Sequence, residues 1–364
     1  MKYIVVLLLL VLNPYFSVEQ VDRLRMDTDM FQCLNQGKYD SVSVLANNVL
    51  KESGKLEEDT SVYKMNAYTV LGIIHKNKGF YVSAIDFNLK LLAIAEKVKD
   101  SARMSVAYNN IGELYKFQNN IDQAILYFNK SLELEMSLKN DVQRSIRLYN
   151  LGESYKQLDS FDIALSYFNN SLILEKRNSN IVGVNYAMLG LVDIYLEINQ
   201  MTEAKRFLDK VNKDKLNDDY DLKRLYDFLL LKYYIKSKAT NESKSLLNEI
   251  QRSKNGTVDL IFDINLLKLE IELHKNSSEW HLMSEKYQEL INLSEKYQSS
   301  EIQNRMNDLI YFNELKKKDI EIELIENQKV TIEELKSFTN KLSIFLLLVL
   351  IFTVGYVVYN LKKK

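Results

Sequence analysis

Two stretches of the chain carry the same pattern of apolar and polar positions, displaced by 40 residues. The first is Ser105–Leu138 and the second is Ser145–Asn178. In each, apolar and small residues recur three and four positions apart on both sides of a short polar break. This spacing is typical of two amphipathic helices joined by a turn. A fixed period of this length predicts a stacked array of helix pairs.

The matched positions of the two copies have a simple packing logic. In the first copy, Gly112 and Ala124 are small, so the two helices of a pair can approach closely. Phe128 is expected to be buried, filling the space between neighbouring pairs. The polar break is Asn119-Asn120, and Asn favours turns because its side chain competes for backbone hydrogen bonds. The second copy repeats the same residues at Gly152, Ala164 and Phe168.

The sequence Leu/Ile-Gly-x-x-Tyr, followed by Ala and by Phe four residues later, resembles the tetratricopeptide repeat. The 40-residue period resembles the longer variety of that repeat, although the Pro that usually ends a unit is absent. The resemblance implies an all-α fold in which helical hairpins stack into a solenoid. It also implies a concave groove, lined by the first helix of each pair, that holds a protein or peptide partner.

The predicted array covers residues 18–300 and contains about seven helix pairs. The repeat signature is clearest at 65–218, and the last two pairs, 222–253 and 258–297, rest on helical periodicity alone. The only Pro of the chain is Pro14, and there are only ten Gly. A long sequence without Pro favours helices throughout, because Pro breaks a helix interior.

The resemblance also implies where a partner binds. In the long variety, the Asn just before the Leu-Gly pair often contacts the ligand backbone. In this sequence a carboxylate and an ammonium follow one helical turn further along the same face of both units. The predicted partner-binding residues are Asn110, Glu113 and Lys116 in one unit and Asn150, Glu153 and Lys156 in the next. In the alternative interpretation, the two Asn residues cap or bridge helices and the charges are only solvated.

The C-terminal part of the chain changes character. Residues 301–341 are rich in Glu, Lys, Asn and Gln, which predicts a polar helix or a short coiled coil through which a homodimer can form. Residues 342–359 carry no charge over 18 positions, enough for a helix of ~27 Å, so we expect a transmembrane helix. The basic tail at 360–364 predicts a cytoplasmic C-terminus.

The N-terminus points to the same topology. Residues 1–17 combine Lys2, the apolar run Ile4–Leu12 and the turn-forming Asn13-Pro14, which is typical of a signal peptide. An uncleaved anchor or a buried helix is the alternative. Together, the two apolar ends predict a single-pass protein of the bacterial inner membrane with its repeats on the periplasmic side.

Composition and candidate chemistry exclude several classes of function. The net charge of −1 argues against direct binding of nucleic acid, which needs clustered Lys and Arg. A single cysteine, Cys33, excludes an internal disulfide. His75 occupies a packing position of the repeat, whereas His274 and His281 can share a helix face but lack a clear third metal ligand. We therefore expect no metal, no cofactor and no enzymatic activity.

Two functions remain open at this stage. The first is a membrane-tethered scaffold that binds a protein or peptide on the exported side. The second is a signal-transducing receptor, because the layout resembles bacterial membrane-bound sensor proteins with an exported repeat array, a coiled coil and one transmembrane helix. Those sensors continue into a kinase or DNA-binding output domain, which is missing after Lys364. A truncated member of that family is included in the second possibility.

Overall fold

The computed structural model describes residues 29–34, 36–53, 60–253 and 259–362, apart from the side chains of 52, 322, 323, 326 and 342–362. The predicted signal peptide lies outside these residues. The predicted transmembrane helix, 342–359, lies where the structure describes no side chains. Among the described residues, no helix is long and apolar enough to cross a membrane.

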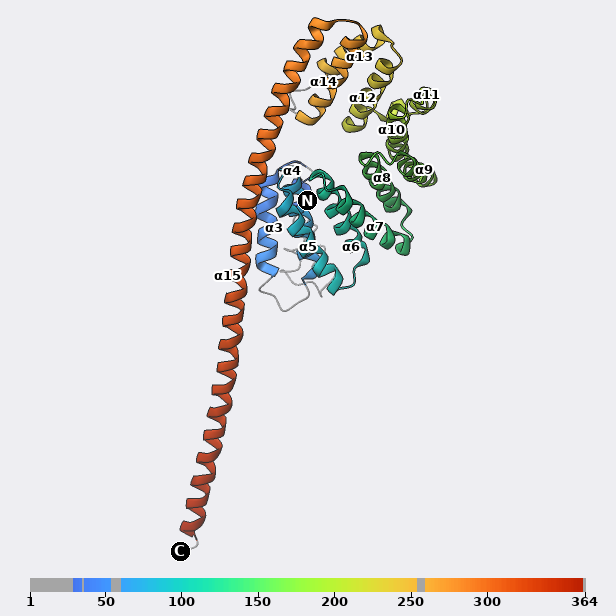
Figure 1. Cartoon of the computed structure of the whole chain (residues 1–364). Coiled ribbons are helices and arrows are strands. Elements are labelled where there is room, and N and C mark those ends of the chain that lie inside the picture. Colours follow the sequence, from blue (N-terminus) through green and yellow to red (C-terminus); the bar gives the residue numbers. More distant parts are fainter. Residues whose placement is uncertain (1–28, 35, 54–59, 254–258, 363–364) are drawn as a thin grey trace, which may run out of the picture. The chain divides into compact units, whose positions relative to one another are not determined.

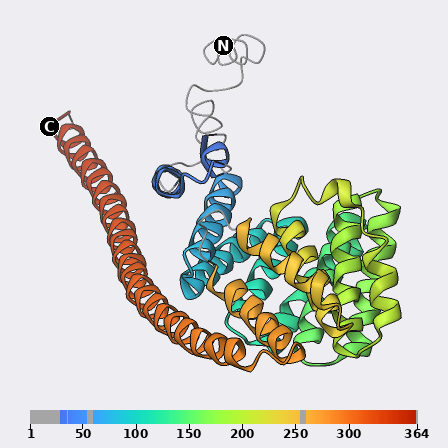
Figure 2. The same cartoon turned by 90° about the horizontal axis from the view of Figure 1, so that it is seen from above.

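The described chain is helical, as predicted, and consecutive helices pack side by side (Figure 1). Seen from above, the helices of the array lie next to one another in chain order (Figure 2). Their bounds are α3 (Tyr39–Ser53), α4 (Ser61–Asn77), α5 (Tyr81–Lys97), α6 (Ser101–Phe117), α7 (Ile121–Leu138), α8 (Asp141–Gln157), α9 (Phe161–Arg177), α10 (Ile181–Glu197), α11 (Met201–Leu208), α12 (Tyr220–Lys236), α13 (Thr240–Arg252), α14 (Leu260–Asn276) and α15 (Trp280–Lys362), with a short 3-10 turn at Lys213–Lys215.

Most turns between helices share one backbone conformation, in which one residue is left-handed. The break predicted at Asn119-Asn120 separates α6 from α7: Asn119 has a left-handed backbone with φ of 58°, and the Asn120 side chain accepts a hydrogen bond from the Gln123 N–H. Asn tolerates the left-handed region and is a favoured helix N-cap, so these two residues suit their places. The same left-handed conformation recurs at Lys99, Lys139, Asp159, Ser179, Asn199, Lys238 and Ser278.

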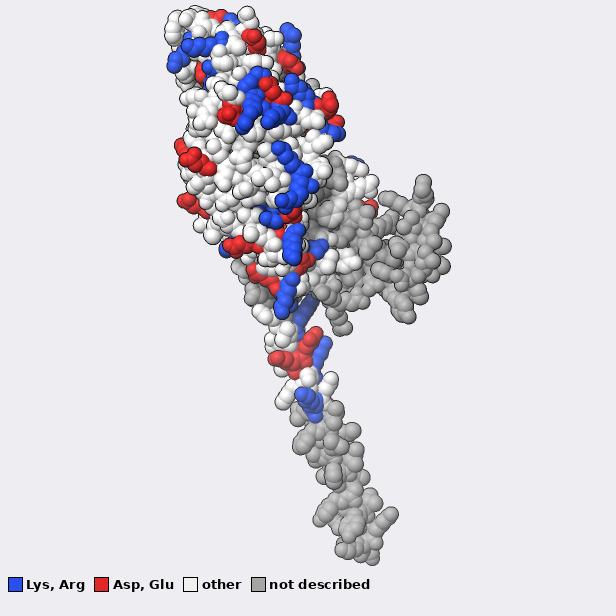
Figure 3. Space-filling model, turned by 90° about the vertical axis from the view of Figure 1, so that its right-hand side faces the viewer, with Lys and Arg blue, Asp and Glu red and all other residues white. Residues whose placement is uncertain are grey.

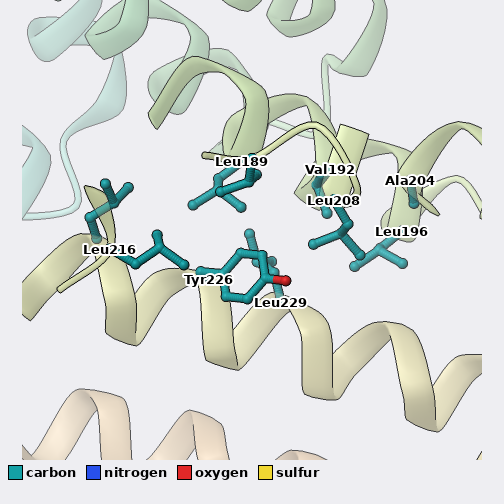
Figure 4. Packing of buried hydrophobic residues seen from close by; sticks show 10 residues of the cluster. Leu189, Val192, Leu196, Ala204, Leu208, Leu216, Tyr226 and Leu229 are labelled. Carbon is teal, nitrogen blue, oxygen red and sulfur yellow. The ribbon is translucent and has the colours of Figure 1, made fainter. Parts of the chain in front are cut away.

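The core is made of apolar side chains shared between successive helices. Phe128 and Phe168 are fully buried, as predicted, and a Cβ on Gly112 would come within 2.7 Å of the Phe128 ring. The glycine therefore allows the close approach that the repeat needs. Further along, side chains from α10, α11 and α12 form one cluster, which includes Leu189, Val192, Leu196, Ala204, Leu208, Tyr226 and Leu229 (Figure 4).

The chain divides into two compact units after Asp308, so α15 begins in the first unit and continues through the second. Within the first unit, Asp308 is 2% exposed and caps the start of α5. Its carboxylate accepts hydrogen bonds from the backbone N–H groups of Val82 (2.6 Å) and Ser83 (3.1 Å) and from the Ser83 hydroxyl (2.6 Å). The beginning of α15 is thereby bound to an early helix of the array.

Candidate functional site

The first helices of successive pairs contact one another in series. α6 packs against α8, α8 against α10, α10 against α12, and α12 against α14. This arrangement brings together side chains that lie one repeat apart in the sequence. Polar residues on these helices therefore bond across the array rather than only within their own helix.

Five charged residues on α8, α10 and α12 form what we call the charge ladder: Glu153, Lys156, Asp193, Glu197 and Lys232. The Lys156 ammonium donates to Glu153 (3.0 Å) and to Asp193 (2.8 Å). The Lys232 ammonium donates to the other Asp193 oxygen (2.7 Å) and to Glu197 (2.7 Å). Two lysines and three carboxylates are thus joined in one line across three helices.

Partial burial makes the charge ladder stronger than ordinary surface pairs. The side chains of Lys156, Asp193 and Lys232 are 20%, 18% and 12% exposed. Burial alone would raise the pKa of Asp193, but Lys156 and Lys232 outweigh it and lower the pKa to about 2. Burial alone would lower the pKa of Lys156, yet Glu153 and Asp193 raise it above its ordinary value. Asp193 and Lys156 therefore stay charged over the ordinary pH range.

The two predicted Asn residues bridge helices. Asn150, which is 7% exposed, donates its side-chain N–H to the side-chain amide oxygen Oδ1 of Asn109 (2.9 Å), and this bond joins α8 to α6. Asn110 donates to the Asn88 side chain on α5 (3.0 Å). A primary amide offers two N–H donors and an oxygen acceptor, so one such bond leaves each group capacity for a ligand.

The structure separates the six predicted residues into two sets. Glu153 and Lys156 belong to the charge ladder. Glu113 instead pairs with Lys76 on α4 (3.1 Å) and accepts from Asn109 (2.9 Å), while Lys116 lies half-buried one turn further along α6. The functional candidates that sequence reasoning missed are Lys76, Asn109, Asp193, Glu197 and Lys232.

A periodic signal for two of the missed residues is present in the sequence. Carboxylates stand at 113, 153 and 193, and lysines stand at 76, 116 and 156, each series at 40-residue intervals. The cross-helix pairs Lys76–Glu113 and Lys156–Asp193 both join positions 37 apart. Extending the two series by one repeat would have identified Lys76 and Asp193, whereas Lys232 belongs to neither.

The histidines behave differently from one another. His75 is buried, as predicted, with its ring 5.0 Å from Phe87, and burial lowers its pKa to about 4. The expectation that His274 and His281 share a helix face is wrong, because the turn at Ser277–Ser278 places them on α14 and α15. His274 bonds instead to Glu279 (2.7 Å). Within the described residues, no group of side chains is arranged to hold a metal.

Charges of both signs intermingle on the face of the molecule shown in Figure 3. Neither sign forms a continuous field there, in agreement with the net charge of −1. The residues of the charge ladder are therefore distinguished from other charged residues by their ion-pair partners and their partial burial. Stacked helix pairs with bonded polar residues on their first helices define an α-solenoid.

Comparison with known proteins identifies the repeats. Residues 63–134 match the tetratricopeptide repeat family. That segment therefore contains tetratricopeptide repeats, and the array built on it has the tetratricopeptide-type fold predicted from the sequence. No protein of the curated collections matches the chain at a significant level.

Solved structures share this fold at low sequence identity. The apo form of RapI is 12% identical, with a TM-score of 0.63 over 76% of this chain and 99% of its own. A Rap conjugation gene regulator of plasmid pLS20, in complex with the Phr* peptide, is 15% identical, with a TM-score of 0.58 over 77% and 75%. A tetratricopeptide repeat protein from Parabacteroides merdae is 14% identical, with a TM-score of 0.51 over 78% and 98%.

Proposed function

We propose that this protein is a membrane-tethered tetratricopeptide repeat scaffold that binds a protein or peptide along the first helices of its array. The observation that carries the proposal is the charge ladder, together with the Asn109–Asn150 bond. These groups present amides, carboxylates and ammonium groups at regular intervals on one helical layer. An extended peptide offers main-chain donors and acceptors at regular intervals that such groups can bind.

The solved neighbours support a peptide as partner. The pLS20 regulator has the same fold over most of this chain, and its structure is a complex with a peptide. The partner is proposed to approach on the exported side of the bacterial inner membrane. This part of the proposal rests on the apolar runs at 1–17 and 342–359 and on the basic tail after them.

The proposal is tested with a partner obtained by affinity capture from detergent-solubilised membranes. The double variant Asn110→Ala/Asn150→Ala removes both amides from the first helices. We expect its affinity for the captured partner to fall roughly fivefold for each lost hydrogen bond, about 1 kcal/mol each. Binding is measured by calorimetry on the full-length protein in detergent.

Because Asn150 also bonds to Asn109, the double variant is expected to be somewhat less stable. The melting temperature is therefore measured alongside the dissociation constant. Asn170→Ala is the matched control, since Asn170 is exposed on a second helix, α9. An unchanged dissociation constant in the double variant would remove Asn110 and Asn150 from the site.

A signal-transducing receptor is the second candidate, and Asp308 is the observation that favours it. This residue of α15 caps α5 through three hydrogen bonds. A helix that continues toward the proposed anchor is thus bonded to the array that binds the partner. If binding is coupled to this contact, Asp308→Asn must change the partner's dissociation constant, because coupling between two sites is reciprocal. Equal constants for wild type and variant would exclude the receptor mechanism through Asp308.

A further inference from the structure

Two buried Ser–Ser–Glu clusters occupy equivalent places in neighbouring repeats. The first consists of Ser105, Ser131 and Glu135, and the second, 40 residues later, of Ser145, Ser171 and Glu175. In both clusters the first serine donates its hydroxyl to the glutamate, over 2.5 Å to Glu135 and 2.6 Å to Glu175. The two glutamates are 2% and 4% exposed.

The first cluster is completed by an arginine from the next first helix. Arg147, on α8, is 3% exposed and donates its Nε to the Ser131 hydroxyl (2.7 Å). Its terminal nitrogen lies 3.7 Å from Glu135. The buried carboxylate therefore has a cation beside it, as a buried charge requires.

Among the described residues, no arginine takes the equivalent place in the second cluster. The residue that matches Arg147 on the next first helix, α10, is Ala187, and the residue that matches Gln143 is Gly183. A Cβ on Gly183 would fall 2.4 Å from a Glu175 carboxylate oxygen, so the glycine allows that group to lie where it does. In the part of the chain that the structure describes, the Glu175 Oε2 atom is buried without a hydrogen-bond partner, as is Glu135 Oε2 in the first cluster, so the two clusters differ in the neighbouring cation and not in this atom.

A hollow of about 280 Å³ lies beside the second cluster and is lined in part by Gly183. Ser171 and Glu175, the counterparts of the two groups that hold Arg147, are part of its lining. Tyr149 and Tyr186 also line it, with ring centroids 6.1 Å apart and planes at 75°. The Tyr186 hydroxyl donates to Asp219 (3.2 Å), which fixes the ring.

We propose that this hollow receives the guanidinium group of an arginine side chain from a peptide bound along the array, in the way that Arg147 fills the first cluster. The proposal deepens the proposed function, on which it rests. A guanidinium matches the lining because it donates to a carboxylate and a hydroxyl at once and stacks on aromatic rings. The volume is just below the roughly 300–1,000 Å³ of sites for drug-sized ligands, so a single side chain is the appropriate occupant.

The test compares two probes on the full-length protein in detergent. N-acetyl-arginine amide carries the guanidinium, and N-acetyl-citrulline amide is its neutral analogue of nearly equal shape. We expect the arginine amide to bind at least tenfold more tightly by ligand-observed NMR. Equal affinity of the two amides would overturn the proposal without any variant.

Two variants test the assignment to this hollow. Glu175→Gln removes the charge and should weaken binding of the arginine amide at least tenfold. Ala187→Arg supplies the internal arginine of the first cluster and should abolish binding. Glu133→Gln, at an exposed position of α7, is the matched control and should bind as wild type does. Unchanged binding in folded Glu175→Gln, judged by circular dichroism, would overturn the proposal.

The result of the amide-binding test is independent of the result obtained with the Asn110→Ala/Asn150→Ala variant. In one outcome, the protein binds the arginine amide more tightly than the citrulline amide, and the Asn110→Ala/Asn150→Ala variant keeps its affinity for the captured partner. The hollow is then a guanidinium site, and the proposal that Asn110 and Asn150 bind the partner is wrong. In the other outcome, the double variant loses affinity for the captured partner and both amides bind equally. The proposed role of Asn110 and Asn150 is then kept, and the proposed guanidinium site is wrong.

Discussion

At the scale of single residues, buried polar side chains bond between helices as well as to their own turns. Arg147 and Glu135 lie almost wholly out of solvent, and Asn150 bonds to Asn109 across the first helices. Such groups are costly to bury unless they are paired, so each one fixes the relative position of two helices. The specificity of stacking therefore depends on polar contacts in addition to apolar volume.

His75 gives a pH-dependent prediction at this scale. Burial lowers the pKa of the folded-state imidazole to about 4, below its unfolded value of 6.5. Between these pH values the unfolded chain binds a proton that the folded chain does not. The free energy of unfolding should therefore fall as the pH drops from about 6.5 to about 4, by about 3 kcal/mol at most.

The control is His75→Tyr, which installs the residue found at the matching position, Tyr115, of the next repeat. Urea denaturation at several pH values measures the effect. The variant should lose this part of the pH dependence. The stability that is lost when Asp193 is protonated, with a folded-state pKa of about 2, is lost only at more acidic pH. An identical pH profile for both proteins would refute the role of His75.

Single residues also show how far the sequence alone could predict the structure. The burial of Phe128 follows from spacing, because a large apolar residue recurs opposite a glycine on the partner helix. The bond between Asn150 and Asn109 does not follow from spacing, because it depends on how far one first helix is displaced along the next. Glu175 and the hollow beside it depend on the absence of a side chain at Gly183, which periodicity does not reveal.

At the scale of the helix, the 40-residue repeat is two copies of a 20-residue half-unit. Most helices from α4 to α10 have 17 residues, and left-handed turn residues recur at 99, 119, 139, 159, 179 and 199. The pattern fades after this because α11, the next second helix, has only 8 residues and is followed by a 3-10 turn. Sequence reasoning located the later helices from apolar periodicity but had no signal for the shortening of α11.

The turn at Asp159 carries a prediction for helix termination. Asp159 has φ of 53°, where Gly is preferred, and Gly occupies the equivalent place at Gly79. Asp159→Gly should stabilise the protein by roughly 0.5–1 kcal/mol, because relief of the left-handed strain exceeds the added entropy of the unfolded chain. The urea midpoint is the measurement.

Gln157→Gly, two residues earlier at the last residue of α8, is the matched control. There the introduced glycine should destabilise the protein, by less than the ~1 kcal/mol that glycine costs in a helix interior. The two midpoints should therefore move in opposite directions. A lower midpoint for Asp159→Gly would show that the left-handed residue carries no strain.

At the scale of the whole molecule, topology is the main prediction. If the proposed signal peptide and the proposed membrane span are correct, residues 18–341 should lie outside the cytoplasm. Protease added to intact spheroplasts should then digest the repeats, and a cytoplasmic marker protein should remain whole in the same sample. Protection of the repeats until the cells are lysed would refute this orientation.

The bonds of Asp308 to α5 have a consequence for how the array melts. In an open solenoid each repeat contacts only its neighbours, so the ends can fray while the middle stays folded. Here one carboxylate joins residues that are 225 and 226 positions apart. Unfolding of α5 deprives α15 of its partner at Asp308, and the converse is equally true. The early and late parts of the array therefore share their stability, and unfolding becomes more cooperative than the repeat count alone implies.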